Sequence, residues 1–196
     1  RKMFIPEDGE EYALIDLYSA EAYLTALDAG ELGMLELLDK GVKTYQVMLD
    51  ETTKLFPSEV AHAGYDYKKA KQTIHACNYG VEVFKMVMES GLPRRICEWQ
   101  YDRYHSMYPG IKDRMKRIRD EVNGTRWSTS PLGRRRYWVA PSGNELNNAA
   151  YAWSSQSCIG EITKAGMNKL YALSCRHEIG DDRSEEHTSE LQSRPH

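Results

Sequence analysis

The stretch Lys71-Gln72-Thr73-Ile74-His75-Ala76-Cys77-Asn78-Tyr79-Gly80 lies inside a segment, about Tyr67 to Glu89, where apolar residues recur every three or four positions. This spacing predicts one long amphipathic helix. Lys71, His75 and Tyr79 stand four residues apart, so they share a second face of that helix. Such a row is suited to hold a triphosphate at its cationic end and to stack a base at Tyr79, beside the open Gly80. The alternative is the half-exposed flank of an ordinary helix.

Further helices are expected on both sides of this segment. Their predicted positions are the helix-favouring stretch Ser19–Leu38, the amphipathic segment Lys43–Phe56, a helix from Pro93 to Met107, a helix from there to about Val122, and a last helix from Glu145 to Ser174. Pro93, and the string Tyr108-Pro109-Gly110, mark where one helix ends or the next begins.

Three short segments alternate in the manner of strands. Tyr12 to Leu17 is the first, and Thr125 to Ser130 with Arg134 to Val139 predict a hairpin around Pro131-Leu132-Gly133, after a turn at Asn123-Gly124. The acid at the tip of the first strand, Asp16, is suited to Mg²⁺, which prefers hard oxygen ligands. An ordinary surface aspartate that caps the next helix is the alternative interpretation.

Length and composition describe an ordinary folded chain. With 196 residues and 41% hydrophobic content, it can bury a core. No run reaches the roughly 20 apolar residues of a membrane span, and no secretory signal is visible, so we expect a soluble, intracellular protein. The four cysteines, Cys77, Cys97, Cys158 and Cys175, are scattered without zinc-finger spacing, which indicates core thiols in a reducing compartment and no zinc.

Charge is divided unevenly along the chain. Residues 1–60 carry 5 basic and 13 acidic side chains, whereas residues 61–140 carry 16 basic and 8 acidic ones. Nine of the cations lie between positions 112 and 136: Lys112, Arg114, Lys116, Arg117, Arg119, Arg126, Arg134, Arg135 and Arg136. Interleaved aromatic residues, Trp127, Tyr137 and Trp138, favour a nucleic-acid partner over a merely solvated helix face.

Two further features complete the sequence. Gln156, in the polar string Trp153-Ser154-Ser155-Gln156-Ser157-Cys158, has an amide that can donate to the minor-groove acceptors of any base pair, although a lone Gln carries little weight. The tail Arg183–His196 lacks apolar periodicity and looks like a translated sequencing adapter. We treat it as an artefactual, disordered tail and exclude it from the fold.

Taken in order, these motifs resemble those of family-A DNA polymerases, the DNA polymerase I kind and its phage-like branches in particular. The matching strings are Asp16-x-x-x-x-Glu21, Lys71-x-x-x-His75-x-x-Asn78-Tyr79-Gly80, Tyr104-x-x-x-Tyr108-Pro109-Gly110, Gly133-Arg134-Arg135, and Gln156. The resemblance covers about Tyr12 to Ser174. It implies an α+β, predominantly helical fragment of palm and fingers, with a palm segment at residues 1–45, fingers helices at 46–122, and a hairpin and helix returning to the palm at 123–182.

The same resemblance implies template-directed transfer of a dNTP to a primer 3′-hydroxyl, with two Mg²⁺ ions in the complete enzyme. Asp16 is then the catalytic metal ligand, joined by the Leu17 carbonyl. The implied nucleotide-binding residues are Glu21, Lys71, His75, Tyr79 and Gly80, with Glu21 excluding the ribose 2′-hydroxyl. Arg134, Arg135 and Gln156 are implied to contact primer–template DNA. The implied setting is a bacterial or phage-infected cytoplasm.

The sequence departs from the family pattern at several positions. Lys71 and His75 replace the usual Arg and Lys of the fingers motif, Val83 stands where a Tyr commonly packs against the Glu21 position, and Asn148 and Ala152 replace Arg and Asn. The His-Asp-Glu motif expected about 30 residues beyond Gln156 is missing. We therefore expect the 196-residue chain to be inactive by itself, because one carboxylate does not hold two Mg²⁺ ions against their repulsion.

Two other functions remain open at this point. A non-catalytic nucleic-acid-binding module would use the 112–136 basic segment alone, and its DNA affinity would depend on salt but not on dNTP. A single-subunit RNA polymerase of related architecture is the second, against which Glu21 and the string Asn78-Tyr79-Gly80 speak.

Overall fold

The computed structural model describes residues 17–175, which are helical apart from one two-stranded hairpin. The elements are α1 (Ala20–Ala29), α2 (Leu32–Asp39), α3 (Thr44–Leu55), α4 (Pro57–Ala63), α5 (Tyr67–Ala76), the short 3₁₀ helix η1 (Cys77–Tyr79), α6 (Val83–Ser90), α7 (Arg94–Met107), α8 (Pro109–Thr125), β1 (Trp127–Thr129), β2 (Arg135–Tyr137) and α9 (Asn144–Cys175). This composition confirms the predominantly helical α+β prediction. The first predicted strand, including Asp16, lies outside the described residues except for Leu17.

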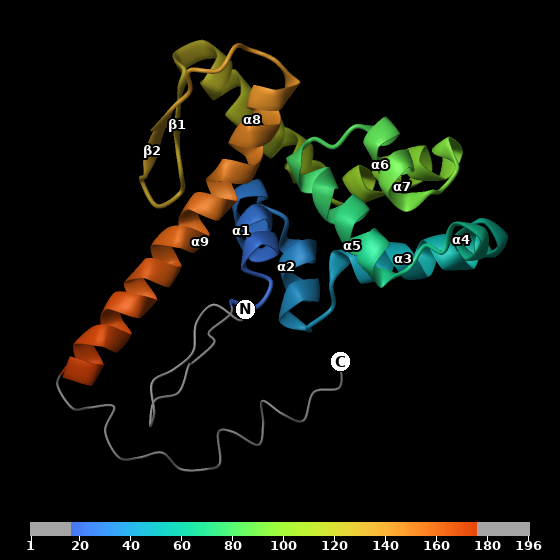
Figure 1. The fold of residues 1–196 in the computed structure, drawn as a ribbon, viewed down its shortest axis with the longest axis horizontal. Helices are drawn as coiled ribbons and strands as arrows, with labels where there is room; N and C mark the ends of the chain where they lie inside the picture. Colours follow the sequence, from blue (N-terminus) through green and yellow to red (C-terminus); the bar gives the residue numbers. More distant parts are fainter. Residues whose placement is uncertain (1–16, 176–196) are drawn as a thin grey trace, which may run out of the picture.

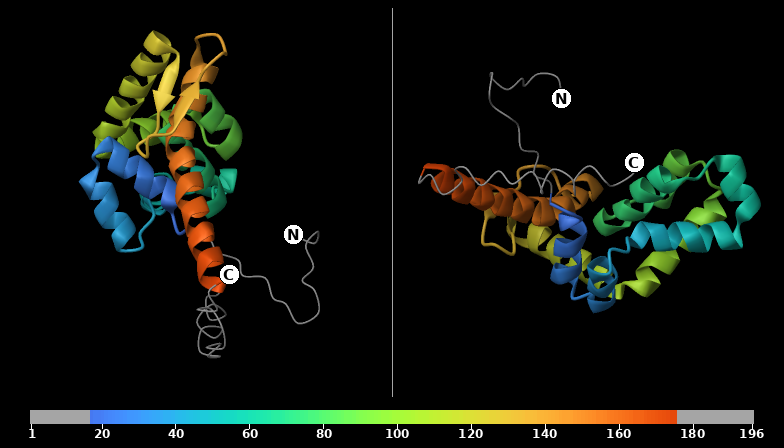
Figure 2. Two further views of the ribbon diagram at one scale, coloured as in Figure 1. Left: turned by 90° about the vertical axis from the view of Figure 1, so that its left-hand side faces the viewer. Right: turned by 90° about the horizontal axis from the view of Figure 1, so that it is seen from below.

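The helices form two groups (Figure 1). Helices α3 to α7 pack together on one side, while α1, α8, α9 and the hairpin lie on the other. Helix α1 packs against both α8 and α9, and β1 also contacts these two helices (Figure 2). The C-terminal half of α9 extends away from the rest, and most of its side chains from Glu161 to Tyr171 are exposed. None of the helices between residues 17 and 175 combines the length and hydropathy of a membrane span.

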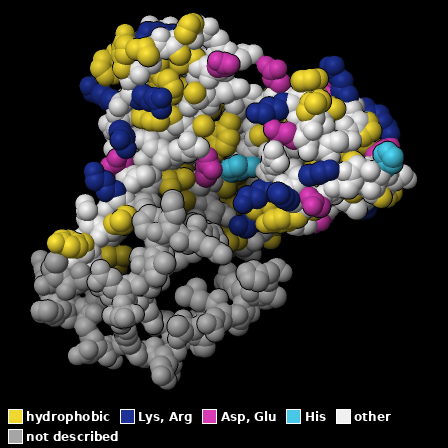
Figure 3. Space-filling view, in the orientation of Figure 1, with side chains coloured by type: hydrophobic (Ala, Val, Ile, Leu, Met, Phe, Trp, Pro, Cys, Tyr) yellow, Lys and Arg dark blue, Asp and Glu magenta, His cyan; other side chains and the backbone are white. Residues whose placement is uncertain are grey.

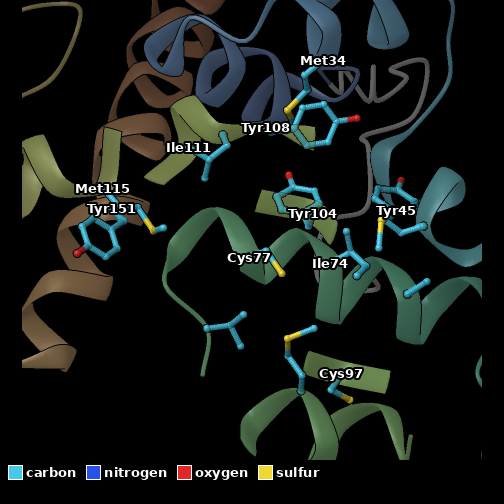
Figure 4. Close-up of a cluster of buried hydrophobic side chains, with 14 of the residues drawn as sticks. Met34, Tyr45, Ile74, Cys77, Cys97, Tyr104, Tyr108, Ile111, Met115 and Tyr151 are labelled. Carbon is cyan, nitrogen blue, oxygen red and sulfur yellow. The ribbon is translucent and has the colours of Figure 1, made fainter. Parts of the chain in front are cut away.

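The core is built around the junction of α5, η1 and α7 (Figure 4). Tyr104 is fully buried there, and its hydroxyl donates to Asn78 Oδ1 at 2.7 Å. Cys77, Cys97 and Cys158 are free and buried, as predicted for core thiols, whereas the side chain of Cys175 is not described. A hydrogen bond in this apolar surrounding fixes the register of η1 against α7.

The helix predicted over Tyr67 to Glu89 is interrupted, so that prediction is wrong in its continuity. Helix α5 begins after Asp66, whose carboxylate accepts the Lys69 N–H at 2.9 Å. The chain then tightens into η1 and turns at Gly80, where φ is +75°. Apolar spacing continues through this turn, but Gly80 readily leaves the right-handed helical conformation, so the periodicity alone overestimates the helix.

A second prediction, the turn at Asn123-Gly124, is also wrong because α8 continues to Thr125. The Asn123 side chain donates to the Arg119 carbonyl at 2.8 Å and to Asn147 Oδ1 at 3.0 Å, so this turn-prone residue holds the helix to α9. The helix ends instead at Arg126, which has a left-handed φ of +63°. Tertiary contacts have overridden the local turn preference.

The hairpin follows its prediction, with shorter strands. Trp127 lies opposite Tyr137, and Thr129 lies opposite Arg135. The loop closes through the Gly133 N–H, which donates to the Ser130 carbonyl at 2.8 Å. The face of the hairpin that carries the pair Trp127 and Tyr137 therefore also carries Arg135.

Candidate functional site

An open cleft of about 1130 Å³ lies between the start of α1, the α2–α3 loop, α5 and α9. Its polar lining includes Glu21, Lys43, Lys71 and His75, and its apolar wall is made by α9 through Ile159, Ile162, Met167 and Leu170. Leu17, the first described residue, also lines it. The structure therefore brings Glu21 to the same cleft as Lys71 and His75 of α5.

Glu21 is the centre of a polar cluster in this cleft. Its Oε2 lies 3.2 Å from His75 Nε2, and its Oε1 accepts a hydrogen bond from Gln156 Nε2 at 3.4 Å. The hydrogen bond from His75 lowers the pKa of Glu21 to about 2, against partial burial that acts in the opposite direction. At neutral pH the carboxylate only accepts, so His75 Nε2 carries the proton in this contact.

Tyr79 lies behind His75 instead of in the cleft. The two rings meet edge to face with centroids 5.5 Å apart. The Tyr79 hydroxyl is buried near Glu21 and Thr25, at a geometry short of a regular hydrogen bond. Burial, together with the negative charge of Glu21, raises the pKa of Tyr79, so the hydroxyl stays protonated. The ring thus supports the imidazole, and its expected contact with a base stays a prediction.

Two lysines supply positive charge at the cleft. Lys71 is exposed and makes no ion pair within the described part of the chain. The other, Lys43, was missed by the sequence analysis. It stands directly before α3, donates from Nζ to Ser19 Oγ at 3.0 Å, and lies 4.2 Å from the centre of the Tyr18 ring. No motif marks Lys43, because it reaches the cleft only through the path of the α2–α3 loop.

The described residues do not by themselves form a metal site. Between residues 17 and 175, no group of three or more His, Cys, Asp or Glu side chains is placed to hold an ion. Both oxygens of Glu21 are already engaged by His75 and Gln156. Asp16, the predicted metal ligand, lies outside the described residues, so no step of the chemistry is assigned to a metal here.

The remaining predicted site residues lie away from the cleft. A Cβ on Gly80 would meet Asn148 Oδ1 at 2.6 Å and the Tyr151 ring at 3.0 Å, so this glycine gives α9 room to approach. Its expected role beside a nucleotide stays a prediction. Arg134 pairs with Glu161 of α9 at 2.8 Å, and Arg135 is exposed on β2. Basic and hydrophobic side chains mingle at the upper left of Figure 3, where Figure 1 places the hairpin.

Several of the nine cations in the 112–136 basic segment are engaged inside the fold. Arg114 is buried and, like Arg117, pairs with Asp28. Arg126 donates to the carbonyls of the chain after β2, including that of Trp138 at 3.2 Å. These arginines therefore hold the fold together, which leaves fewer of the nine cations available for phosphates.

Comparison with known proteins agrees with this arrangement of motifs. Residues 1–181 match DNA polymerase family A. The DNA polymerase of Mycobacterium phage L5 is 20% identical over 171 residues, which cover 87% of this chain and 26% of that protein. The POL domain of Pol1 from M. smegmatis, solved in complex with DNA primer-template and dNTP, superimposes with a TM-score of 0.52 and 16% identity over 70% of this chain and 24% of that chain.

The chain thus spans about a quarter of the length of these two relatives. The structural likeness bears on the fold, and the family match extends over most of the sequence. On that match, this chain belongs to DNA polymerase family A.

Proposed function

We propose that the protein to which this chain belongs synthesises DNA on a template, and that the cleft is part of its dNTP site. The observation that carries this proposal is the meeting of Glu21 from α1 with Lys71 and His75 from α5 in one cleft. Glu21 is 50 positions from Lys71 and 54 from His75, and family membership supports a nucleotide as their common ligand. A purely structural role would not require Lys71 to be exposed and without an ion pair among residues 17–175.

The cations of the cleft suit the triphosphate of a nucleotide. Lys71 and Lys43 are point charges on flexible side chains, and His75 presents a ring nitrogen next to them. A polyanion gains from several such donors when the surrounding walls are partly apolar, as the α9 wall is. Glu21 then lies on the sugar side of the same nucleotide, with Tyr79 supporting the imidazole.

Family members use divalent metal ions in general, and we propose Mg²⁺ for this protein, with Asp16 and the Leu17 carbonyl as its ligands in this chain. Bound there, two such ions would lower the pKa of the primer hydroxyl and neutralise the leaving pyrophosphate. Arg134, Arg135 and Gln156 are proposed to contact primer–template DNA. We also propose palm and fingers with the boundaries expected from the sequence.

Nucleotide binding tests the cleft directly. A fluorescent dATP analogue is titrated with Mg²⁺ into the full chain, its Lys71→Ala variant and the matched control Lys54→Ala, a lysine exposed on α3 away from the cleft. Losing one charge-assisted contact is expected to weaken binding about tenfold in Lys71→Ala and to leave Lys54→Ala unchanged. Equal affinities in all three proteins would contradict the proposed site.

Primer extension tests the expected incompleteness. We propose that the 196-residue chain does not extend a primer by itself, because its sequence lacks the His-Asp-Glu motif of the family. Template-dependent extension that Asp16→Ala abolishes would overturn this. DNA binding with a steep salt dependence and no response to Mg²⁺ or dNTP would instead support the non-catalytic binding module.

A further inference from the structure

The Glu21 carboxylate is held from two sides by side chains of distant helices. His75 of α5 contacts Oε2 at 3.2 Å, and Gln156 of α9 donates to Oε1 at 3.4 Å. The Glu21 and His75 side chains are each 28% exposed, so both remain accessible from the cleft. The shorter contact comes from the imidazole, which therefore determines where this carboxylate points.

The side chain at position 83 does not help to hold the Glu21 carboxylate. Val83 has no polar atom in its side chain, and it lines a different cleft, next to Lys112, Lys116 and Asn148. A hydrogen bond from position 83 to Glu21 is therefore ruled out by chemistry. In this chain, the α5 residue that supports Glu21 from the fingers side is His75.

The imidazole is itself held in place. Its ring meets the edge of the Tyr79 ring at 5.5 Å and 80°, and the Tyr79 side chain packs against the core. A glutamate has three rotatable bonds, and a charged carboxylate without a strong partner turns toward water. Without the imidazole, Glu21 would keep the longer 3.4 Å contact from Gln156 and the nearby Tyr79 hydroxyl.

We propose that His75 is the positioning residue for Glu21, so that the choice between a deoxyribose and a ribose nucleotide depends on His75. This role of His75 rests on the proposed dNTP site, and it adds selection of the sugar to the binding of the nucleotide. A carboxylate fixed beside the sugar leaves no room for a 2′-hydroxyl, whereas one that swings into solvent does. His75 therefore acts on the two ends of the nucleotide, on the phosphates directly and on the sugar through Glu21.

The test separates affinity from selectivity. Dissociation constants for dATP and for ATP, each with Mg²⁺, are measured on the full chain and on three variants. His75→Ala removes the contact to Glu21, His75→Gln retains an N–H donor for it, and Lys71→Ala removes a phosphate cation that makes no contact with Glu21. Circular dichroism and thermal unfolding confirm that each variant is folded.

We expect the wild-type chain to prefer dATP by about tenfold, a typical penalty for a misplaced hydroxyl. His75→Ala should bring this ratio to within about twofold of one, and His75→Gln should restore most of it. Lys71→Ala should weaken both nucleotides and keep the ratio. If His75→Ala weakens both nucleotides equally and keeps the ratio, His75 touches only phosphate and the proposal is wrong.

Two other outcomes are informative in different ways. A wild-type chain that binds dATP and ATP equally contradicts the positioning role of His75 but leaves the nucleotide site intact. A wild-type chain that binds neither contradicts the proposed function, and the positioning role with it.

Discussion

Two acid–base networks start from the same helix and differ in burial. Asp28, near the end of α1, pairs with Arg114 of α8 at 2.7 Å, and Ser155 of α9 accepts from the same guanidinium at 3.2 Å. Glu21, about two turns earlier on α1, pairs with His75 and is bonded by Gln156 of α9. Both networks thus join α1 to α9 and to one further helix.

The side chains of the two networks differ in how far they are exposed to solvent. The Arg114 side chain is 0% exposed and that of Asp28 12%, whereas Glu21 and His75 are each 28% exposed and line the cleft. A buried charge that loses its partner is costly, while a half-exposed charge can exchange its partner for water or a ligand. The Asp28–Arg114 network therefore fixes the fold, and the Glu21–His75 network is the one available for function.

The largest effect is expected from Arg114→Leu. It leaves the Asp28 carboxylate with the exposed Arg117 and the Ser154 hydroxyl, and it removes the donor to the Tyr151 carbonyl, so the free energy of unfolding should fall by about 3–5 kcal/mol. Urea denaturation measures this. The control Arg117→Leu removes the 55% exposed partner of Asp28 and should cost less than about 1 kcal/mol. Equal losses would mean that burial does not distinguish the two arginines.

A second prediction contrasts two histidines. His105 is buried, and neither of its ring nitrogens has a hydrogen-bond partner within the described residues, unlike His75. Burial, with the nearby charge of Lys112, lowers the pKa of His105 to about 4. The unfolded chain takes up this proton near pH 6.5, so its contribution to the free energy of unfolding is present above pH 6.5 and falls by about 3 kcal/mol as pH approaches 4. Between pH 6.5 and pH 4, the free energies of unfolding of wild type and His105→Gln, measured with urea, should change differently with pH. The same pH dependence in both proteins would contradict the lowered pKa of His105.

The close approach of α9 to the turn at Gly80 should make this position sensitive to one added methyl group. Gly80→Ala places a Cβ against Asn148 and Tyr151 at a φ of +75°, so we expect a loss of about 1–2 kcal/mol in thermal unfolding. The matched control is Gly124→Ala in α8, where a Cβ meets nothing within 4 Å and should be neutral or slightly stabilising. A tolerated Gly80→Ala would show that α9 approaches less closely than described.

The smallest effect is expected from the open network. Glu21→Gln keeps the shape of the side chain and should cost about 1 kcal/mol or less at pH 7, because the carboxylate is partly solvated. Since the pKa of Glu21 falls from 4.5 to about 2 on folding, its contribution is present above pH 4.5 and is lost as pH falls to 2. The free energies of unfolding of the wild type and of Glu21→Gln should therefore converge as the pH is lowered from about 6 to about 2. A constant difference would assign the effect to packing.

The sequence predicts most of the fold because its helices carry strong local signals. Pro93 and Pro109 mark the starts of α7 and α8, and apolar spacing marks the buried faces. The break at Gly80 follows from glycine's own backbone freedom, which apolar spacing does not register. The continuation through Asn123 depends on its contact with α9, so tertiary contact prevails over local turn preference there.

The site is predictable only in part, and for a comparable reason. Motif spacing selects Glu21, Lys71 and His75, which do line one cleft. It does not reveal Lys43, which no motif contains, or the bond between Glu21 and His75, which joins two helices across 54 positions. Nor does it show that Arg114 is buried, since a basic run looks alike on a surface and in a core.

The most direct measurement is an amide ¹H–¹⁵N titration of the labelled chain with Mg²⁺ and dATP. The account predicts chemical-shift changes at Glu21, Lys43, Lys71 and His75 around the cleft, and none at Asp28 or Arg114. Changes confined to the Asp28–Arg114 network or to the hairpin, with none around the cleft, would contradict it.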